Sequence, residues 1–289
     1  MPRRQTTGSV VCPSCGRLVG VQADRCPNCG RWNPGLWGWA PALGRFGGAL
    51  SIANLIFTGC VVMLGVSLAI DLGNVRMDFP FGLLGPSGEA LVTLGASGFW
   101  PLFGLGRWWT PLSAGWLHGG AVHIAFNLYY LLWLLPQCEK IFGLGRTLII
   151  YTVSSITGFT LTSVLFGLTQ PGGPLSFLPN ALSGAPLTVG ASASLCGLLG
   201  ALLLYTQKTG QTAHSQRIWQ SALFILLFGF LVSMVDNWAH IGGFVGGWLA
   251  ASLLKPLEDE SPLHLLVGLL CLLATGAAIL LSVLSPLPG

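Results

Sequence analysis

Long stretches of this sequence contain no Asp, Glu, Lys or Arg, and they constrain the fold more than any other feature. A transmembrane helix needs about 20 mostly apolar residues, and most of the stretches are that long. Only 8% of the 289 residues are charged, against roughly 25% in soluble proteins. The sequence therefore predicts an all-α polytopic membrane protein. The charge-free stretches are Phe46–Ile70, Pro111–Cys138, Thr147–Gln207, Ile218–Val235, Asn237–Leu254 and Ser261–Gly289.

The longest charge-free stretch is expected to hold two helices. A Pro-Gly-Gly-Pro sequence at residues 171–174 and a proline-rich segment at residues 179–186 interrupt it, because proline and glycine break helices. The first apolar segment lies too far from Met1 to be a cleaved signal peptide. Seven spans are therefore expected, near residues 47–70, 113–135, 146–168, 190–206, 217–235, 237–254 and 263–284.

The basic residues predict an orientation in the membrane. If the N-terminus is cytoplasmic, eleven of the thirteen Lys and Arg residues fall in inner segments, and only Arg76 and Arg107 fall in outer ones. Cytoplasmic segments carry an excess of Lys and Arg, so we expect a cytoplasmic N-terminus and an outer C-terminus in a plasma (inner) membrane. The net charge of +4 mostly reflects this bias and gives little reason to invoke nucleic acid.

Four cysteines near the N-terminus predict a metal site. Cys12 and Cys15 form one CxxC pair and Cys26 and Cys29 form a second, with ten residues between the pairs. This spacing is typical of a four-thiolate zinc ribbon, and a cytoplasmic location disfavours disulfides. Residues 1–45 are therefore expected to be a cytoplasmic zinc ribbon and linker with a structural zinc ion. We expect a docking or stability role, with a cytoplasmic protein as its partner.

Two potentially reactive polar residues stand at the heads of apolar spans. Ser192 begins the fourth span and His240 begins the sixth. Polar groups at membrane depth are costly and are functional hypotheses by default, and a serine near a histidine is the minimal nucleophile and base. The alternative for Ser192 alone is helix capping or a hydrogen bond between helices. The pair predicts a serine protease that works inside the bilayer.

The second span carries three further polar residues. His123 and Asn127 are four residues apart and share a helical face, so we expect both to point at one site as hydrogen-bond donors. His118 is five residues before His123 and turns away from that face, which favours a role in anchoring a loop. The alternative for each of the three is a hydrogen bond between helices.

Small residues predict a close crossing of the fourth and sixth spans. Gly243 and Gly247 share a face with His240, and small residues at such spacing let helix backbones approach closely. The crossing would bring His240 within hydrogen-bond reach of Ser192. Asp236 could orient His240 as a third member, or it could be solvated at the interface. The small residues of the fourth span are Ala193, Gly197 and Ala201.

In combination and order, these residues resemble the rhomboid family of intramembrane serine proteases. The resemblance covers residues 46–254 and implies a six-helix protease core. Residues 255–289 are expected to hold a cytoplasmic loop and the seventh span. A seventh span after the core is similar to the six-plus-one arrangement of some members. The zinc ribbon lies outside the resemblance. The motifs that carry it are His118-Gly119-Gly120 with His123 and Asn127, Gly190-Ala191-Ser192, and Ala239-His240-Ile241-Gly242-Gly243.

The resemblance implies a role for each site residue. Ser192 is expected to be the nucleophile and His240 the general base, without a required acid or a catalytic cofactor. The oxyanion hole is expected to comprise the Ser192 backbone N–H, His123 and Asn127, while Gly190 fixes the turn before the nucleophile. Structural roles beside the site are expected for two more residues, His118 and Gly243.

This chain departs from the family pattern at three places. The usual glycine after the serine is Ala193, and the aromatic often found four residues after the serine is Cys196. The Trp-Arg pair of the first outer loop is Trp109-Thr110, with Arg107 displaced. None of these departures removes a catalytic group. They bear on the rate and on loop rigidity.

Other functions have weaker support from the sequence. A zinc metalloprotease would need a His-Glu-x-x-His helix, and an aspartyl protease would need two aspartates within spans. A transporter would show charged residues in its spans or helices broken in a repeated pattern. The serious alternative is an inactive rhomboid-like protein that binds membrane clients. We expect instead a protease that cleaves transmembrane protein substrates near the outer membrane face.

Overall fold

The computed structural model describes residues 4–12, 17–30, 32–39, 51–179, 182–232, 235–285 and 287. The chain divides into two compact units, Met1–Leu55 and Ile56–Gly289. The boundary predicted between residues 45 and 46 lies outside the described residues.

The N-terminal unit contains a short antiparallel hairpin. Strand β1 (Ser9–Val11) pairs with β2 (Leu18–Gly20), and Val10 lies opposite Val19. Both strands alternate exposed and buried residues, as a hairpin with one covered face does. A 3-10 turn, η1 (Leu36–Gly38), follows. The small core of this unit combines aliphatic side chains with two cysteines: Val10, Val19, Val21, Cys12 and Cys26.

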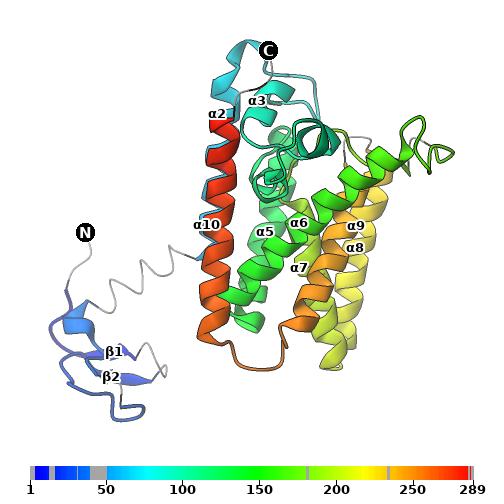
Figure 1. Ribbon diagram of the computed structural model, residues 1–289. Coiled ribbons are helices and arrows are strands. Elements are labelled where there is room, and N and C mark those ends of the chain that lie inside the picture. Colours follow the sequence, from blue (N-terminus) through cyan, green and yellow to red (C-terminus); the bar gives the residue numbers. More distant parts are fainter. Residues whose placement is uncertain are drawn as a thin grey trace. The chain divides into compact units, whose positions relative to one another are not determined.

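The second unit is mostly helical (Figure 1). All but one of its long helices run close to the expected spans, and several short helices lie between the first and the second long helix. The long helices are α2 (Ile52–Ile70), α5 (Ala121–Phe142), α6 (Leu144–Thr169), α7 (Ser192–Lys208), α8 (Thr212–Leu231), α9 (Asn237–Leu253) and α10 (Pro262–Leu284). The short ones are η2 (Leu72–Asn74), α3 (Gly88–Thr93), η3 (Trp100–Gly104), α4 (Thr110–Ser113) and η4 (Ala114–Trp116).

The predicted bounds of the second span were wrong. We expected a helix near residues 113–135, but α5 begins at Ala121 and continues to Phe142. The preceding residues form α4, η4 and a turn, and Gly120 leaves no room for a Cβ beside the Leu83 carbonyl oxygen, which lies 2.9 Å from that position. The Ala121 N–H donates to the same carbonyl oxygen at 2.7 Å. The segment between α2 and α5 therefore packs against the N-terminal end of α5 and fixes where the helix starts.

Three helices in the described part of the chain are long and apolar enough to cross a membrane by length and composition. They are α2, α6 and α10, with mean hydropathies of 2.1, 1.6 and 2.5 over their most apolar windows. The other long helices are shorter or more polar, since α7 and α9 have 17 residues each and α5 carries Glu139 and Lys140 in its last turn. The protein is an integral membrane protein, and the count of seven spans stays a prediction.

Helix α7 packs most extensively against α9 and also contacts α5, α6 and α8. Almost all its residues from Ala193 to Leu204 are buried. A Cβ on Gly243 of α9 would overlap the Ala193 carbonyl oxygen, and one on Gly247 would overlap the Gly197 carbonyl oxygen. The close crossing predicted from the small residues is therefore present, and it places the beginnings of α7 and α9 side by side.

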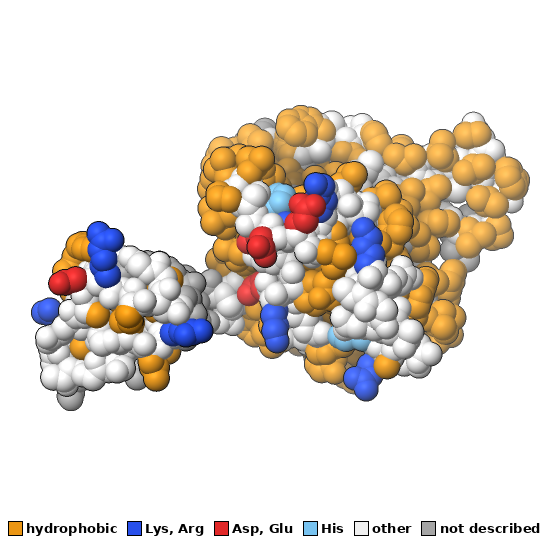
Figure 2. Space-filling model, turned by 90° about the horizontal axis from the view of Figure 1, so that it is seen from below, with side chains coloured by type: hydrophobic (Ala, Val, Ile, Leu, Met, Phe, Trp, Pro, Cys, Tyr) orange, Lys and Arg blue, Asp and Glu red, His pale blue; other side chains and the backbone are white. Residues whose placement is uncertain are grey.

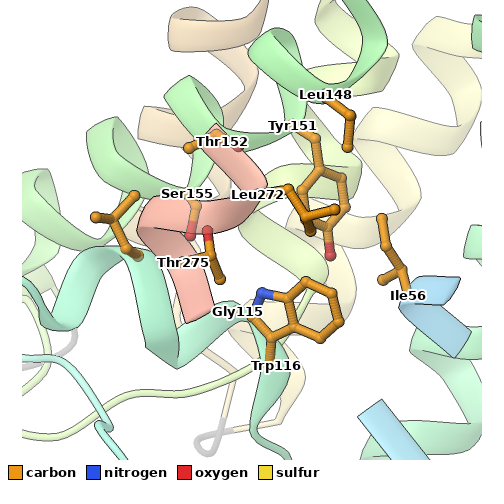
Figure 3. Close-up of a pocket in the computed structure, with 10 residues that line it drawn as sticks. Ile56, Gly115, Trp116, Leu148, Tyr151, Thr152, Ser155, Leu272 and Thr275 are labelled. Carbon is orange, nitrogen blue, oxygen red and sulfur yellow. The ribbon is translucent and has the colours of Figure 1, made fainter. Parts of the chain in front are cut away.

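A small cavity lies on another side of the bundle, between α2, η4, α6 and α10 (Figure 3). Indole, phenol and hydroxyl groups share its wall with aliphatic side chains. None of the predicted site residues lines it, so this cavity lies apart from the candidate site. Its lining residues are Ile56, Leu112, Gly115, Trp116, Leu148, Tyr151, Thr152, Ser155, Leu272 and Thr275.

Charged side chains gather at one end of the helical unit, and hydrophobic side chains surround them (Figure 2). At this end α5, α7 and α9 finish and α6, α8 and α10 begin (Figure 1). Lys140 and Lys208 lie in the last turns of α5 and α7, and Lys255 follows α9. This end is therefore the one that the distribution of basic residues predicts to be cytoplasmic.

Candidate active site

Ser192 is the first residue of α7, directly after a turn that only glycine adopts easily. Gly190 has a φ of +130°, which side chains strongly disfavour. A Cβ there would lie 2.7 Å from His123 Nε2 and 3.5 Å from Ser192 Oγ. The absence of a Cβ therefore lets the His123 ring and the serine hydroxyl lie close to the Gly190 backbone. As the first residue of a helix, Ser192 also presents a backbone N–H without an intrahelical acceptor.

His240 lies in the first turn of α9 and reaches the serine directly. Its Nε2 is 2.8 Å from Ser192 Oγ, and its side chain is 8% exposed. A neutral imidazole that accepts the hydroxyl proton at Nε2 carries its own hydrogen on Nδ1. The structure therefore places the Ser192 hydroxyl and the His240 imidazole at a hydrogen-bonding distance and largely out of water.

Asp236 caps α9 instead of orienting His240. Its Oδ1 accepts the backbone N–H of Ala239 at 3.0 Å and the hydroxyl of Thr162 at 2.9 Å. Among the described residues, Nδ1 of His240 has no hydrogen-bond partner. Aspartate is a favoured N-cap because its carboxylate accepts the unsatisfied N–H groups of the first turn. The arrangement is therefore a Ser-His dyad, without Asp236 as a third member.

His123 is placed to donate a hydrogen bond toward the serine. The Gly119 backbone N–H donates to His123 Nδ1 at 3.3 Å, so a neutral ring carries its hydrogen on Nε2. That nitrogen faces the space beside Gly190. Asn127, one turn along α5, is 4% exposed and donates from Nδ2 to the His123 carbonyl oxygen at 3.0 Å. An amide nitrogen has two hydrogens, so the second can serve another acceptor.

His118 lies before α5 and not within it, which corrects the expectation that it belongs to the second span. Its side chain is fully buried. Its ring stands edge-on to the His123 ring, with the ring centroids 5.2 Å apart and an interplanar angle of 68°. His118 thus packs behind His123 and does not point at Ser192 from the same helical face.

The residues at the three departures from the family pattern are buried or hydrogen-bonded within the protein. Ala193 is fully buried between α6 and α9, and Cys196 is 4% exposed. Arg107 is 3% exposed and donates to the carbonyl oxygens of Val92 and Ser285. Trp109 Nε1 donates to Ser282 Oγ at 2.9 Å. The segment between α2 and α5 is therefore bound to the C-terminal end of α10 through Arg107 and Trp109.

The N-terminal cysteines form a cluster that suits a metal ion. The Sγ atoms of Cys12, Cys26 and Cys29 lie within 4.8 Å of one another, and those of Cys12 and Cys29 are 3.7 Å apart. Tetrahedral zinc with bonds of about 2.3 Å separates its thiolates by about 3.8 Å. The Gly30 N–H closes the second knuckle by donating to the Cys26 carbonyl oxygen at 2.9 Å. Cys15, the fourth predicted ligand, lies outside the described residues.

The fold and the site define an integral membrane protein with a buried serine–histidine pair. The family model of the Rhomboid domain matches residues 105–257, which is more than half of the 289 residues. The chain belongs to the rhomboid family.

One similar protein is named as a protease, and another is named as inactive. The chain is 36% identical over 170 residues to Rhomboid protease GluP of Bacillus subtilis (strain 168), covering 57% of this chain and 30% of that protein. It is 32% identical over 177 residues to RHOMBOID-like protein 7 of Arabidopsis thaliana, covering 60% of this chain and 51% of that protein. It is 31% identical over 190 residues to Inactive RHOMBOID-like protein 8 of the same plant, covering 63% of this chain and 49% of that protein. The chain thus spans about half, or less, of the length of these relatives.

Proposed function

We propose that this protein is an intramembrane serine protease that hydrolyses peptide bonds of transmembrane proteins near the outer membrane face. In this proposal a six-helix core at residues 46–254 carries the site, and the seventh helix packs beside it. The observation that carries the proposal is the 2.8 Å separation of Ser192 Oγ and His240 Nε2. A pair at this distance is what general-base activation of a serine requires.

Acylation uses the dyad and the donors around it. Ser192 Oγ attacks the scissile carbonyl carbon while His240 Nε2 takes the hydroxyl proton. The negative oxygen that forms is stabilised by the backbone N–H of Ser192, by His123 Nε2–H and by Asn127 Nδ2–H. His240 then gives its proton to the amide nitrogen as the C–N bond breaks. The amine product leaves, and Ser192 holds the other half of the substrate as an ester.

Deacylation repeats the chemistry with water. A water molecule gives a proton to His240 and its oxygen attacks the ester carbon, with the same three donors holding the oxyanion. The C–Oγ bond breaks, Ser192 recovers the proton from His240, and a carboxylic acid product leaves. No cofactor takes part in either half, since every proton moves between substrate, water and the dyad.

Cleavage of a transmembrane substrate by the purified protein tests this proposal. The wild type in detergent should cleave a model single-span substrate, and Ser192→Ala should not. Ser194→Ala is the matched control, because Ser194 is a buried serine two residues further along the same helix. Substantial cleavage by Ser192→Ala, or none by the wild type, would contradict the proposal.

The second candidate function is client binding without hydrolysis; one relative is named as inactive. A binding protein does not need a serine within hydrogen-bonding distance of a histidine. In this chain Ser192 and His240 lie at such a distance. The same cleavage assay separates the two functions, because a binding protein would retain the substrate intact.

For the N-terminal unit we propose a structural zinc site on the cytoplasmic side. Cys12, Cys15, Cys26 and Cys29 would hold the ion, which contributes folding energy to a unit with a very small core. A cytoplasmic protein is the proposed partner of this unit. The zinc takes no part in the hydrolysis, because the proposed substrate reaches Ser192 from the outer side.

A further inference from the structure

The 2.8 Å distance between Ser192 and His240 depends on two separate elements, and nothing in either helix alone sets it. Ser192 follows the loop at residues 182–190, and His240 follows the N-cap of α9. The part of this loop that the structure describes has little regular secondary structure. Its hydrogen bonds to neighbouring elements must therefore fix the position of the nucleophile.

We propose that Thr162 and Asp236 are positioning residues, which hold the serine loop and the histidine helix in register. This inference rests on the proposed protease function. The Thr162 side chain is fully buried on α6. Its Oγ1 accepts the backbone N–H of Ala185 at 2.9 Å and donates its hydrogen to Asp236 Oδ1 at 2.9 Å. One hydroxyl group thus joins the loop before Ser192 to the cap before His240.

In the described part of the chain, Thr162 differs from the other hydroxyl residues of α6 because it joins two other elements at once. The hydroxyls of Ser155, Thr157 and Thr169 each reach one other segment, and those of Thr147, Ser154 and Ser163 donate only to carbonyl oxygens four residues earlier in the chain. Such bonds only satisfy the hydroxyl and tie no second element. The hydroxyl of Thr162 instead donates to a carboxylate, which makes a stronger bond than a neutral acceptor does.

The loop and α9 meet around this hydroxyl at several other points. Gly184 packs so closely on α6 that a Cβ would overlap the Thr162 carbonyl oxygen. Trp238 Nε1, in the first turn of α9, donates to the Leu182 carbonyl oxygen at 3.0 Å. The side chain of Thr188 interacts with the Asp236 carboxylate. Both catalytic elements are therefore bound to one buried polar cluster, and a shift of either would break several of its bonds.

Asp236 has a geometric role here that does not need its charge. Its Oδ1 accepts from both Thr162 and the Ala239 N–H, and an asparagine oxygen can accept the same two bonds. Asparagine is also a favoured N-cap. A third member of a catalytic triad would instead need the carboxylate and a bond to His240.

Labelling of Ser192 by a fluorophosphonate probe tests the proposal on the full-length protein in detergent. Thr162→Val and Asp236→Ala should each lower the labelling rate and kcat for a model substrate by at least about tenfold, as a misplaced dyad does, with KM little changed. Thr162→Ser and Asp236→Asn should stay close to the wild-type rate. The double variant Thr162→Val with Asp236→Ala should be little slower than either single variant, because both break one connection.

Ser163→Ala is the matched control, since it removes a fully buried α6 hydroxyl that, within the described part of the chain, bonds only its own helix. All rates are measured well below the thermal midpoint, where a loss of stability alone leaves the folded enzyme at full rate. The inference is overturned if folded Thr162→Val labels at the wild-type rate, or if Ser163→Ala is equally slow. If Thr162→Val does not fold, the comparison of Asp236→Ala with Asp236→Asn decides. A wild type that neither labels nor cleaves refutes the protease function itself.

Discussion

Asn127 and His118 both lie beside His123, and the structure predicts opposite consequences for their removal. Asn127 presents a spare amide hydrogen one turn from His123 on α5. His118 is fully buried before the helix and packs edge-on against the His123 ring. Asn127→Ala should therefore act on the rate, and His118→Ala should act on stability.

The expected magnitudes follow from what each side chain does. Loss of one oxyanion donor typically lowers kcat by about 10²–10³-fold, or about 2.7–4 kcal/mol, and we expect this for Asn127→Ala with little change in KM. His118→Ala deletes a whole buried ring, and truncations of large buried side chains cost about 2–5 kcal/mol of stability. His123 and the Ser192 N–H remain as donors in both variants, and Asn127 also remains in His118→Ala. His118→Ala should therefore keep most of the cleavage rate per folded molecule.

The assay measures kcat and KM for a model transmembrane substrate, with active sites counted by a fluorophosphonate probe so that unfolded protein does not enter the rate. The thermal midpoint of each variant is measured in the same detergent. The account is wrong if His118→Ala is fully stable but catalytically dead. It is also wrong if Asn127→Ala cleaves within a few-fold of the wild type.

Three further predictions concern helix packing, the charged end of the helical unit and the metal. Gly243→Ala should lower both the thermal midpoint and the cleavage rate, because its Cβ would overlap the α7 backbone. Gly276→Ala is the control and should lower neither, because the space around Gly276 is open. Equal effects of the two substitutions would refute the close-crossing argument. Arg146→Leu removes three hydrogen bonds to the α9–α10 connection and to α10 and should cost about 3 kcal/mol of stability, with kcat unchanged because the residue lies at the opposite end of α6 from the site. Metal analysis should find one zinc per chain in the wild type and none in Cys26→Ser. Deletion of residues 1–40 should leave cleavage in detergent nearly unchanged. A large loss of activity in that truncation would mean that the N-terminal unit acts on the site.

The charge-free stretches predicted the long helices well, because burial in lipid requires continuous apolar sequence. The start of α5 could not be predicted in this way. Residues 111–120 are as apolar as a helix, but they form short helical turns and a loop that is covered by protein. Their apolar composition indicates burial but not whether lipid or protein covers them. The carbonyl oxygen of Leu83, which accepts the Ala121 N–H, is too distant in sequence to be recognised as its partner.

The approach of Ser192 and His240 could be anticipated because polar residues are rare in such spans and small residues mark close helix crossings. The role of Asp236 could not, since four residues before His240 is a position for a helix cap as much as for a catalytic acid. Thr162 gave no signal at all. In sequence it is one of several hydroxyl residues on an apolar helix, and only the fold shows that its hydrogen bonds leave that helix.

The most direct test of the central claim is the mass of the intact protein after reaction with a fluorophosphonate. The account predicts one adduct per chain, mapped to Ser192 by peptide fragmentation. The adduct should be missing in Ser192→Ala and in His240→Ala, although both variants fold and insert into the membrane. An adduct on another serine, or undiminished labelling of His240→Ala, would contradict a Ser192–His240 dyad.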